Sequence, residues 1–217
     1  GGDELFGGYP SFRDVPRWVR WMALPARVPG LGPLVRRLAS ALGGAIGGRP
    51  RGLSPKAAGL LEYGGTYAGA YLLRRGLFMP WELNRLLDGE LVAEGLEALQ
   101  PLARIGEVLE QGPATAFGRV AALEGSLYMR NQLLRDADWA GMDHSIEIRI
   151  PLVDAWLLRR LAPVLLAQRA IRGKRWLGNS PRRPLPAEVV ERAKTGFTTP
   201  IEGWMQGVAA AREKRGV

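Results

Sequence analysis

The first residues of the chain combine two glycines with two carboxylates, in the order Gly1-Gly2-Asp3-Glu4. A carboxylate such as that of Asp3 can hold a hard cation through its oxygens, and glycine lets the backbone approach a ligand closely because it has no Cβ. Backbone N–H groups in such a loop can also cradle oxyanions. The same composition is typical of an exposed acidic turn, so these residues alone leave a ligand-binding loop and a turn as equal alternatives.

Two segments toward the other end of the chain also carry polar residues in a distinctive order. Residues 144–154 read His-Ser-Ile-Glu-Ile-Arg-Ile-Pro-Leu-Val-Asp, and residues 192–204 read Arg-Ala-Lys-Thr-Gly-Phe-Thr-Thr-Pro-Ile-Glu-Gly-Trp. His144 is the single histidine, so no cluster of histidines can form a metal site. Most lysines lie at the surface, and this is the simplest reading of Lys194 by itself.

Together with the opening residues, these segments resemble the synthetase domain of glutamine-dependent asparagine synthetases. That family shows a Ser-Gly-x-Gly-x-Asp-Glu-x-Phe-Gly-Gly-Tyr loop, a His-Ser-x-Glu-x-Arg-x-Pro-x-x-Asp segment and a Lys-x-Gly-Phe-x-x-Pro segment. All three occur here in this order, apart from the Ser-Gly-x that would precede Gly1. Residues 13–112 carry no signature that matches the family.

The resemblance implies an ATP-dependent amidation of aspartate. A substrate carboxylate attacks the α-phosphate of ATP to give a β-aspartyl-adenylate, and glutamine-derived ammonia then displaces AMP. ATP and Mg²⁺ are the implied cofactors, and both Mg²⁺ and basic side chains would lie where charge develops on the phosphates. By the same resemblance Gly1 and Gly2 lie beside the nucleotide, Asp3 holds the Mg²⁺ with pyrophosphate, and Lys194 is the catalytic lysine that contacts phosphate.

Three further residues are candidates for supporting roles. Glu147 and Arg149 are two positions apart, so on a strand they would point to the same side, either to position the site or as a structural ion pair. Asp138 follows Asp136 at a spacing that suits a loop better than one face of a helix. The structural ion pair is the preferred interpretation for Glu147 and Arg149.

The family fold is α/β, of the PP-loop ATP pyrophosphatase and adenine nucleotide alpha hydrolase type. Its nucleotide-binding PP-loop, Ser-Gly-Gly-x-Asp-Ser, and its N-terminal glutaminase domain are not found in residues 1–217. We therefore expect residues 1–217 to be the C-terminal part of one synthetase domain, predominantly α-helical with at most one or two short strands. On its own we expect this part to be inactive as a ligase.

Composition and charge narrow the classes of partner. There is no cysteine, which excludes disulfides and cysteine-bound zinc, and no apolar run is long enough to cross a membrane. The net charge of +9 comes mainly from scattered arginine pairs, without a dense basic run or a zinc-finger spacing. We therefore expect small-molecule substrates, no nucleic acid and no membrane. The resemblance implies a cytoplasmic enzyme whose full-length parent could form a homodimer.

Apolar periodicity predicts helices over residues 13–22, 31–42, 67–73, 80–87, 114–135 and 155–165. The longest, 114–135, carries a stripe of Ala116, Val120, Leu123, Leu127 and Leu134. Residues 146–150 alternate between isoleucine and charge, which is compatible with a short strand. Asp154 is placed to cap the helix that follows it, and this is preferred over direct catalysis.

Two classes of function remain open at this point. The first is a ligase of the asparagine synthetase type, including relatives such as β-lactam synthetases that act on another carboxylate. The second is a catalytically dead helical domain retained for interaction. The presence of Asp3 and Lys194 within their motifs favours the ligase.

Overall fold

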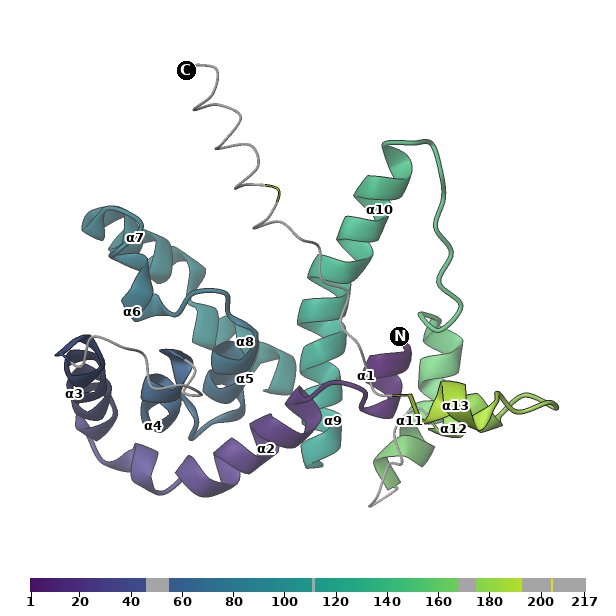
Figure 1. Cartoon of the computed structure of the whole chain (residues 1–217), viewed down its shortest axis with the longest axis horizontal. Helices are drawn as coiled ribbons and strands as arrows, with labels where there is room; N and C mark the ends of the chain where they lie inside the picture. Colours follow the sequence, from purple (N-terminus) through teal and green to yellow (C-terminus); the bar gives the residue numbers. More distant parts are fainter. Residues whose placement is uncertain (46–54, 111, 168–174, 193–203, 205–217) are drawn as a thin grey trace.

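The computed structural model describes residues 1–45, 55–110, 112–167, 175–192 and Trp204, and these residues form helices and connecting turns without a strand. Helices of eight or more residues occur throughout this part of the chain (Figure 1). They are α2 (Ser11–Met22), α3 (Leu31–Ala45), α5 (Tyr67–Arg75), α7 (Gly89–Leu99), α8 (Pro101–Glu110), α9 (Ala116–Leu123), α10 (Arg135–Met142) and α11 (Ala155–Ala167). Shorter ones are α1 (Gly2–Phe6), α4 (Leu60–Tyr63), α6 (Pro80–Leu83), α12 (Arg175–Asn179) and α13 (Ala187–Val190), with 3₁₀ turns η1 (Pro25–Arg27) and η2 (Pro55–Gly59).

Side-chain caps fix where several of these helices begin. The hydroxyl of Thr66 accepts from the Gly69 N–H at 3.1 Å, and that of Thr115 accepts from the Gly118 N–H at 3.1 Å. The Asp154 carboxylate accepts from the Leu157 N–H at 2.7 Å, which confirms the predicted cap of α11. Each bond satisfies a backbone donor that has no partner within its helix, and such a cap contributes about 1 kcal/mol.

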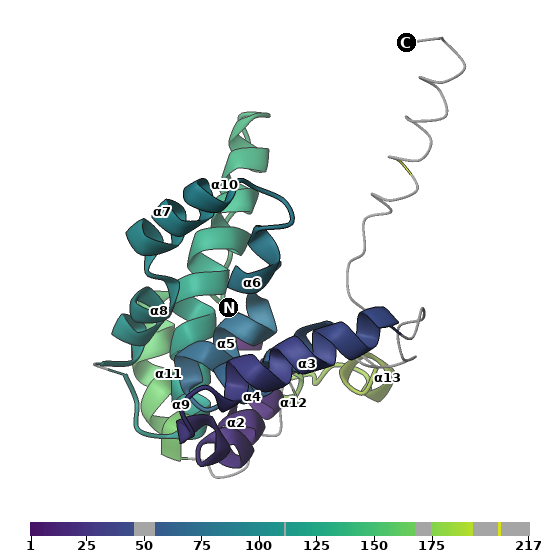
Figure 2. The same cartoon turned by 90° about the vertical axis from the view of Figure 1, so that its left-hand side faces the viewer.

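The longest feature is a continuous rod formed by α9, the π-helix η3 (Glu124–Leu134) and α10 (Figures 1 and 2). The sequence predicted one regular helix over residues 114–135, and the rod instead runs to Met142 with a wide π-wound middle. Val120 and Leu123 of the predicted stripe are buried, whereas Ala116 is exposed. The stripe is therefore only partly correct, because π winding changes the face on which later residues lie.

Two clusters of apolar side chains hold the helices to this rod. Val15 of α2, Ala70 of α5 and Val120 of α9 are fully buried against one another. Leu5 and Phe6 of α1 pack with Leu165 of α11, together with Phe117, Trp176 and Leu177 at the edge. The second cluster is the one that fixes α1, the helix carrying the predicted site residues.

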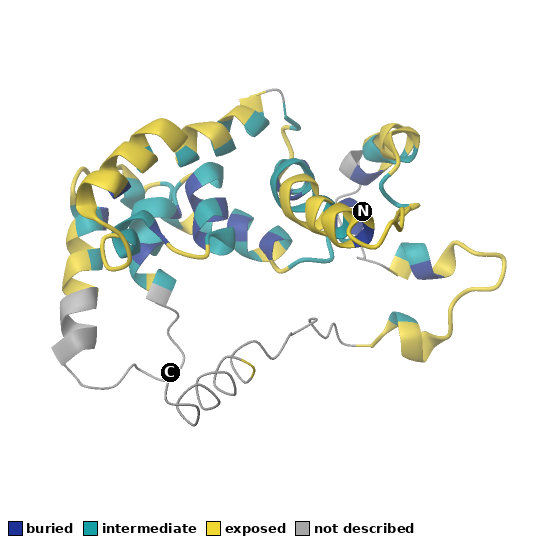
Figure 3. Ribbon diagram, turned by 90° about the horizontal axis from the view of Figure 1, so that it is seen from above, coloured by how far each residue is buried: buried dark blue, intermediate teal, exposed yellow. Residues whose placement is uncertain are grey.

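Many large apolar side chains remain exposed in the part of the chain that the structure describes (Figure 3). Ile146, Ile148 and Ile150 are among them, in irregular chain after α10. The suggested strand over residues 146–150 does not form, since a strand needs a neighbouring strand to take its hydrogen bonds and none is present among the described residues. A predominantly helical chain is confirmed, while the α/β family fold stays a prediction. No helix of the described residues is long and apolar enough to cross a membrane.

Candidate functional site

The acidic residues at the start of the chain lie on a helix of five residues, α1, rather than in an open loop. The helix ends at Gly7, whose φ of 68° is in the left-handed region, and the Gly8 N–H donates to the Asp3 carbonyl at 2.8 Å. Glycine suits this position because other residues adopt a positive φ at a cost. Asp3 is half-buried in the first turn, and Glu4 beside it is only 5% exposed.

The two glycines bring this helix into direct contact with the second motif. A Cβ placed on Gly1 would lie 2.1 Å from the backbone oxygen of Leu152, and one on Gly2 would lie 3.1 Å from the Leu152 side chain. Only a residue without a side chain therefore fits at Gly1. The structure thus places the Gly1-Gly2-Asp3 group against the segment of residues 144–154, although about 150 residues of chain separate them.

Glu4 is tied to the last residue of the opening motif. The Tyr9 hydroxyl donates to Glu4 Oε1 at 2.9 Å. Burial raises the pKa of the Tyr9 phenol above its ordinary range, and the hydrogen bond to Glu4 and the Glu4 charge raise it further. Tyr9 therefore stays a hydroxyl donor toward Glu4 at any physiological pH.

A buried ion pair lies directly behind Tyr9. Glu124, at the start of η3, has no exposed surface, and its carboxylate accepts two hydrogen bonds from Arg75 of α5, at 3.1 and 2.7 Å. Ser11 also donates to Glu124, and Tyr71 donates to it at 3.4 Å. Burial alone would lower the pKa of the Arg75 guanidinium, but the hydrogen bonds and charge of Glu124 raise it overall.

The Arg75 guanidinium also lies within cation–π distance of two aromatic rings. Its central carbon lies 3.7 Å from the centre of the Tyr128 ring and 4.7 Å from that of Tyr9. The two tyrosines meet edge to face, with ring centres 5.8 Å apart. This cluster of Arg75, Glu124, Tyr9 and Tyr128 was not predicted from the sequence. The one feature of the sequence that could have indicated it is Glu124, an acidic residue that directly follows Leu123 in an apolar stripe.

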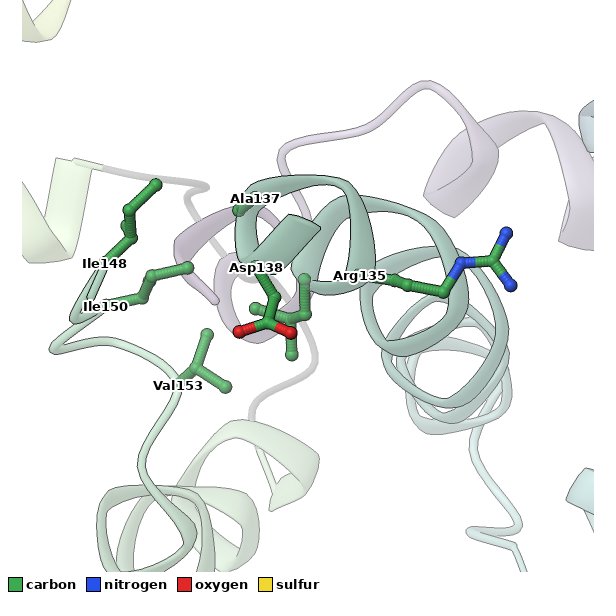
Figure 4. Close-up of a pocket in the computed structure, with 7 residues that line it drawn as sticks. Arg135, Ala137, Asp138, Ile148, Ile150 and Val153 are labelled. Atoms are coloured by element: carbon green, nitrogen blue, oxygen red, sulfur yellow. The ribbon is translucent and has the colours of Figure 1, made fainter. Parts of the chain in front are cut away.

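Asp138 lies on α10, so the prediction that it belongs to a loop was wrong: the helix continues past it to Met142. It lines an open pocket of about 460 Å³ together with Ile148, Ile150 and Val153. Figure 4 shows the Asp138 carboxylate pointing toward Val153, while Arg135 points away. Apolar side chains and the polar residues Arg135 and Asp138 line the pocket together, and it lies beside the segment that contacts α1.

Glu147 and Arg149 form an ion pair with each other at 3.1 Å. Their side chains are 71% and 82% exposed, and they contact no other predicted site residue through a hydrogen bond within the described chain. This geometry agrees with the interpretation as a surface ion pair, which contributes little to stability. Lys194 lies outside the described residues, so its proposed role stays a prediction.

The described residues contain no group of three His, Asp or Glu side chains that could hold a metal ion. Mg²⁺ is usually held by one or two protein carboxylates, with substrate phosphates and water completing its shell. A single carboxylate at Asp3 fits that ion. It would not fit Zn²⁺, which takes three or four protein ligands.

Comparison with known proteins identifies the family of the chain. The family described as asparagine synthase matches residues 1–215, so the match includes both α1 and the Leu152 segment. No curated protein and no solved structure matches the chain significantly. The matching family consists of ATP-dependent ligases of the amidation type. Because the match spans nearly all of its 217 residues, the chain belongs to the asparagine synthase family.

Proposed function

We propose that this chain takes part in the ATP-dependent amidation of aspartate, through a β-aspartyl-adenylate and with glutamine-derived ammonia as the nitrogen donor. The observation that carries the proposal is the contact between Gly1 and the Leu152 backbone. It brings together two of the three motifs on which the resemblance to asparagine synthetases depends. The contact places Asp3, the proposed Mg²⁺ ligand, close to the second motif.

The first chemical step places negative charge on the phosphates of ATP as the substrate carboxylate attacks the α-phosphorus. Mg²⁺, when bound, would neutralise part of this charge. In the proposed site Asp3 holds the ion through its carboxylate. Gly1 and Gly2 are proposed to lie beside the nucleotide by their match to the motif, while the sides that would carry their Cβ atoms pack against Leu152. The bond to pyrophosphate then breaks, and the aspartyl carboxylate remains joined to AMP.

Lys194 is proposed to stabilise the phosphate charge in that step, by its match to the Lys-x-Gly-Phe motif. In the second step ammonia attacks the acyl carbon and AMP leaves. Asp138 and the pocket that it lines with Ile148, Ile150 and Val153 lie next to the segment that contacts α1. We propose a supporting role for Asp138 at that edge of the site and none in catalysis for Glu147 and Arg149, which pair with each other in solvent.

The test uses the purified full-length protein and measures release of pyrophosphate from ATP with aspartate, ammonia and Mg²⁺. Wild type should form asparagine and pyrophosphate in equal amounts. Asp3→Asn should lower kcat/KM for Mg²⁺-ATP by roughly 10²–10³, the usual loss for a group that stabilises developing charge. Glu94→Gln is the matched control, because Glu94 is exposed on α7 and makes no ion pair within the described chain.

Two results would count against the proposal in different ways. Pyrophosphate release with another carboxylate, but not with aspartate, would keep the ligase and replace the substrate. Equal activity in the wild type and Asp3→Asn would remove Asp3 from the site. Absence of pyrophosphate release with every carboxylate tried would overturn the ligase function itself.

A further inference from the structure

We propose that Tyr9 and Arg75 are positioning residues, which hold the acidic helix α1 so that Asp3 faces its ligand. The proposal rests on the proposed function for the role of Asp3, but the contacts that carry it are independent of the resemblance. They run in one line from the rod to the site: Glu124 to Arg75, Arg75 to Tyr9, and Tyr9 to Glu4.

The helix that bears Asp3 cannot be stable by itself. It has only five residues, whereas isolated helices shorter than roughly 12–15 residues are marginal in water. Its orientation must therefore come from tertiary contacts. On its apolar side these are Leu5 and Phe6 in the cluster with Leu165. On its polar side the contact is the hydrogen bond from Tyr9 to the buried carboxylate of Glu4.

Glu4 and Asp3 are consecutive residues on one helical turn, so fixing the rotation of the helix at Glu4 also fixes the direction in which the Asp3 side chain leaves the backbone. A rotation of α1 about its axis would break the 2.9 Å bond between Tyr9 and Glu4. The burial of Leu5 and Phe6 also opposes such a rotation, since it would expose them, but apolar contacts do not by themselves set the direction of a polar side chain. The hydrogen bond supplies the directional part.

Tyr9 is in turn held by Arg75 in a way that suits arginine alone. The guanidinium makes two hydrogen bonds to Glu124, and its central carbon lies over the ring of Tyr128 and within 4.7 Å of the centre of the Tyr9 ring. A planar delocalised cation can do both at once, whereas the compact ammonium of lysine cannot. Because Glu124 belongs to the rod, the line connects the main scaffold of the described chain to α1.

The chain offers a close control for each substitution. Arg119 lies over the ring of Tyr67, with its central carbon 5.1 Å from the ring centre, and so repeats the stacking of arginine on tyrosine. Among the described residues this pair makes no hydrogen bond or ring contact with α1, and the Tyr67 hydroxyl makes no hydrogen bond to a described residue. Tyr67→Phe and Arg119→Lys therefore remove the same groups from a stacked pair that does not hold the site.

The experiment measures two quantities on the full-length protein. The first is amide hydrogen exchange in a peptide that spans residues 2–9, which includes the Leu5 and Gly8 donors bonded to Gly1 and Asp3. Tyr9→Phe should speed this exchange by about three- to tenfold, the equivalent of one net hydrogen bond. Arg75→Lys should do so at least as strongly. Both control variants should leave it within twofold.

The second quantity is the Mg²⁺ concentration that gives half-maximal pyrophosphate release. Tyr9→Phe should raise it by a similar factor, while kcat at saturating Mg²⁺ stays near that of wild type. A residue needed only for folding would lower the amount of active enzyme instead and leave the half-maximal concentration unchanged. Unchanged exchange in both Tyr9→Phe and Arg75→Lys, or faster exchange with an unchanged Mg²⁺ requirement, would overturn the positioning role.

Failure of the proposed function gives a separate result. If Asp3→Asn behaves as wild type, Asp3 is not the Mg²⁺ ligand, and the exchange measurement on Tyr9→Phe still decides whether α1 is anchored through Glu4. If wild type releases no pyrophosphate, the same exchange measurement applies without any activity.

Discussion

Replacing Glu124 by glutamine removes one charge from the buried pair while keeping the size and shape of the side chain. Arg75, which is 25% exposed at its side chain, then keeps its positive charge beside a neutral amide. The amide oxygen can still accept one bond from Arg75 or Ser11. Its NH₂ group, however, brings donors toward a space already filled by donors from Ser11, Tyr71 and Arg75.

Breaking a buried ion pair by removing one partner costs about 3–5 kcal/mol. Because Arg75 retains some contact with water, we expect the lower end, near 3 kcal/mol. In a domain of 150–250 residues 1 kcal/mol corresponds to about 2–4 °C in Tm, so Glu124→Gln should lower Tm by roughly 6–12 °C. Changing both partners, in Glu124→Leu with Arg75→Met, should recover most of this loss, since no charge is then left unpaired.

Differential scanning calorimetry of the full-length protein would measure the loss. Met79→Ala identifies the transition that contains these helices, because Met79 is fully buried and its truncation costs about 2–5 kcal/mol. If Glu124→Gln lowered Tm of that transition by less than about 2 °C, or if the double variant were less stable than either single one, the account of the pair would be wrong.

Three other perturbations have expected outcomes that follow from the same structure. Burial, and then the Glu124 charge, raise the pKa of Tyr71 above its ordinary value of 10.0. The unfolded chain therefore loses this proton first, and the free energy of unfolding should fall as pH rises above 10.0. Urea unfolding at pH 9 and 11 should show a smaller fall in the free energy of unfolding for Tyr71→Phe than for wild type. Gly1→Ala should cost about 1–3 kcal/mol of stability in thermal unfolding, because its Cβ meets the Leu152 backbone, whereas Gly95→Ala, with open space around it, should be neutral or stabilising. Lys194→Ala should lower kcat for asparagine formation by roughly 10²–10³ with little change in KM, whereas Arg192→Ala should leave kcat near that of wild type. If kcat of Lys194→Ala stayed within twofold of wild type, Lys194 would be an ordinary surface lysine.

Local features of the fold could be predicted because they depend on neighbouring residues. The cap at Asp154 and the helix that follows it were identified from one acidic residue ahead of a leucine pattern, and both are present. Helix α2 was likewise predicted from its apolar spacing, with a start two residues too late. Each of these outcomes is set by contacts within about four residues of chain.

Features that depend on distant residues could not be predicted. Arg75 and Glu124 are 49 residues apart, and no local pattern indicates that they meet. The helix α1 is held by Tyr9 and by the cluster around Leu165, which are contacts that no local pattern indicates. Asp3 was therefore predicted in a loop or turn, although it lies on a helix. The site was therefore predictable as a set of motifs, and its geometry was not.

The π-helix η3 affects how the rod would respond to the deletion of a residue. Each residue of an α-helix turns the chain by about 100°, so deleting one residue from the rod would rotate everything after the deletion by about that angle. Asp138 would then leave the side of α10 that faces Val153, although no residue of the pocket had been substituted. A wide-wound segment of eleven residues is where such a deletion could be absorbed with least damage to backbone bonding, since closing one π turn restores an α turn. A one-residue deletion within residues 124–134 would thus change the direction of α10 less than the same deletion within α9 or α10.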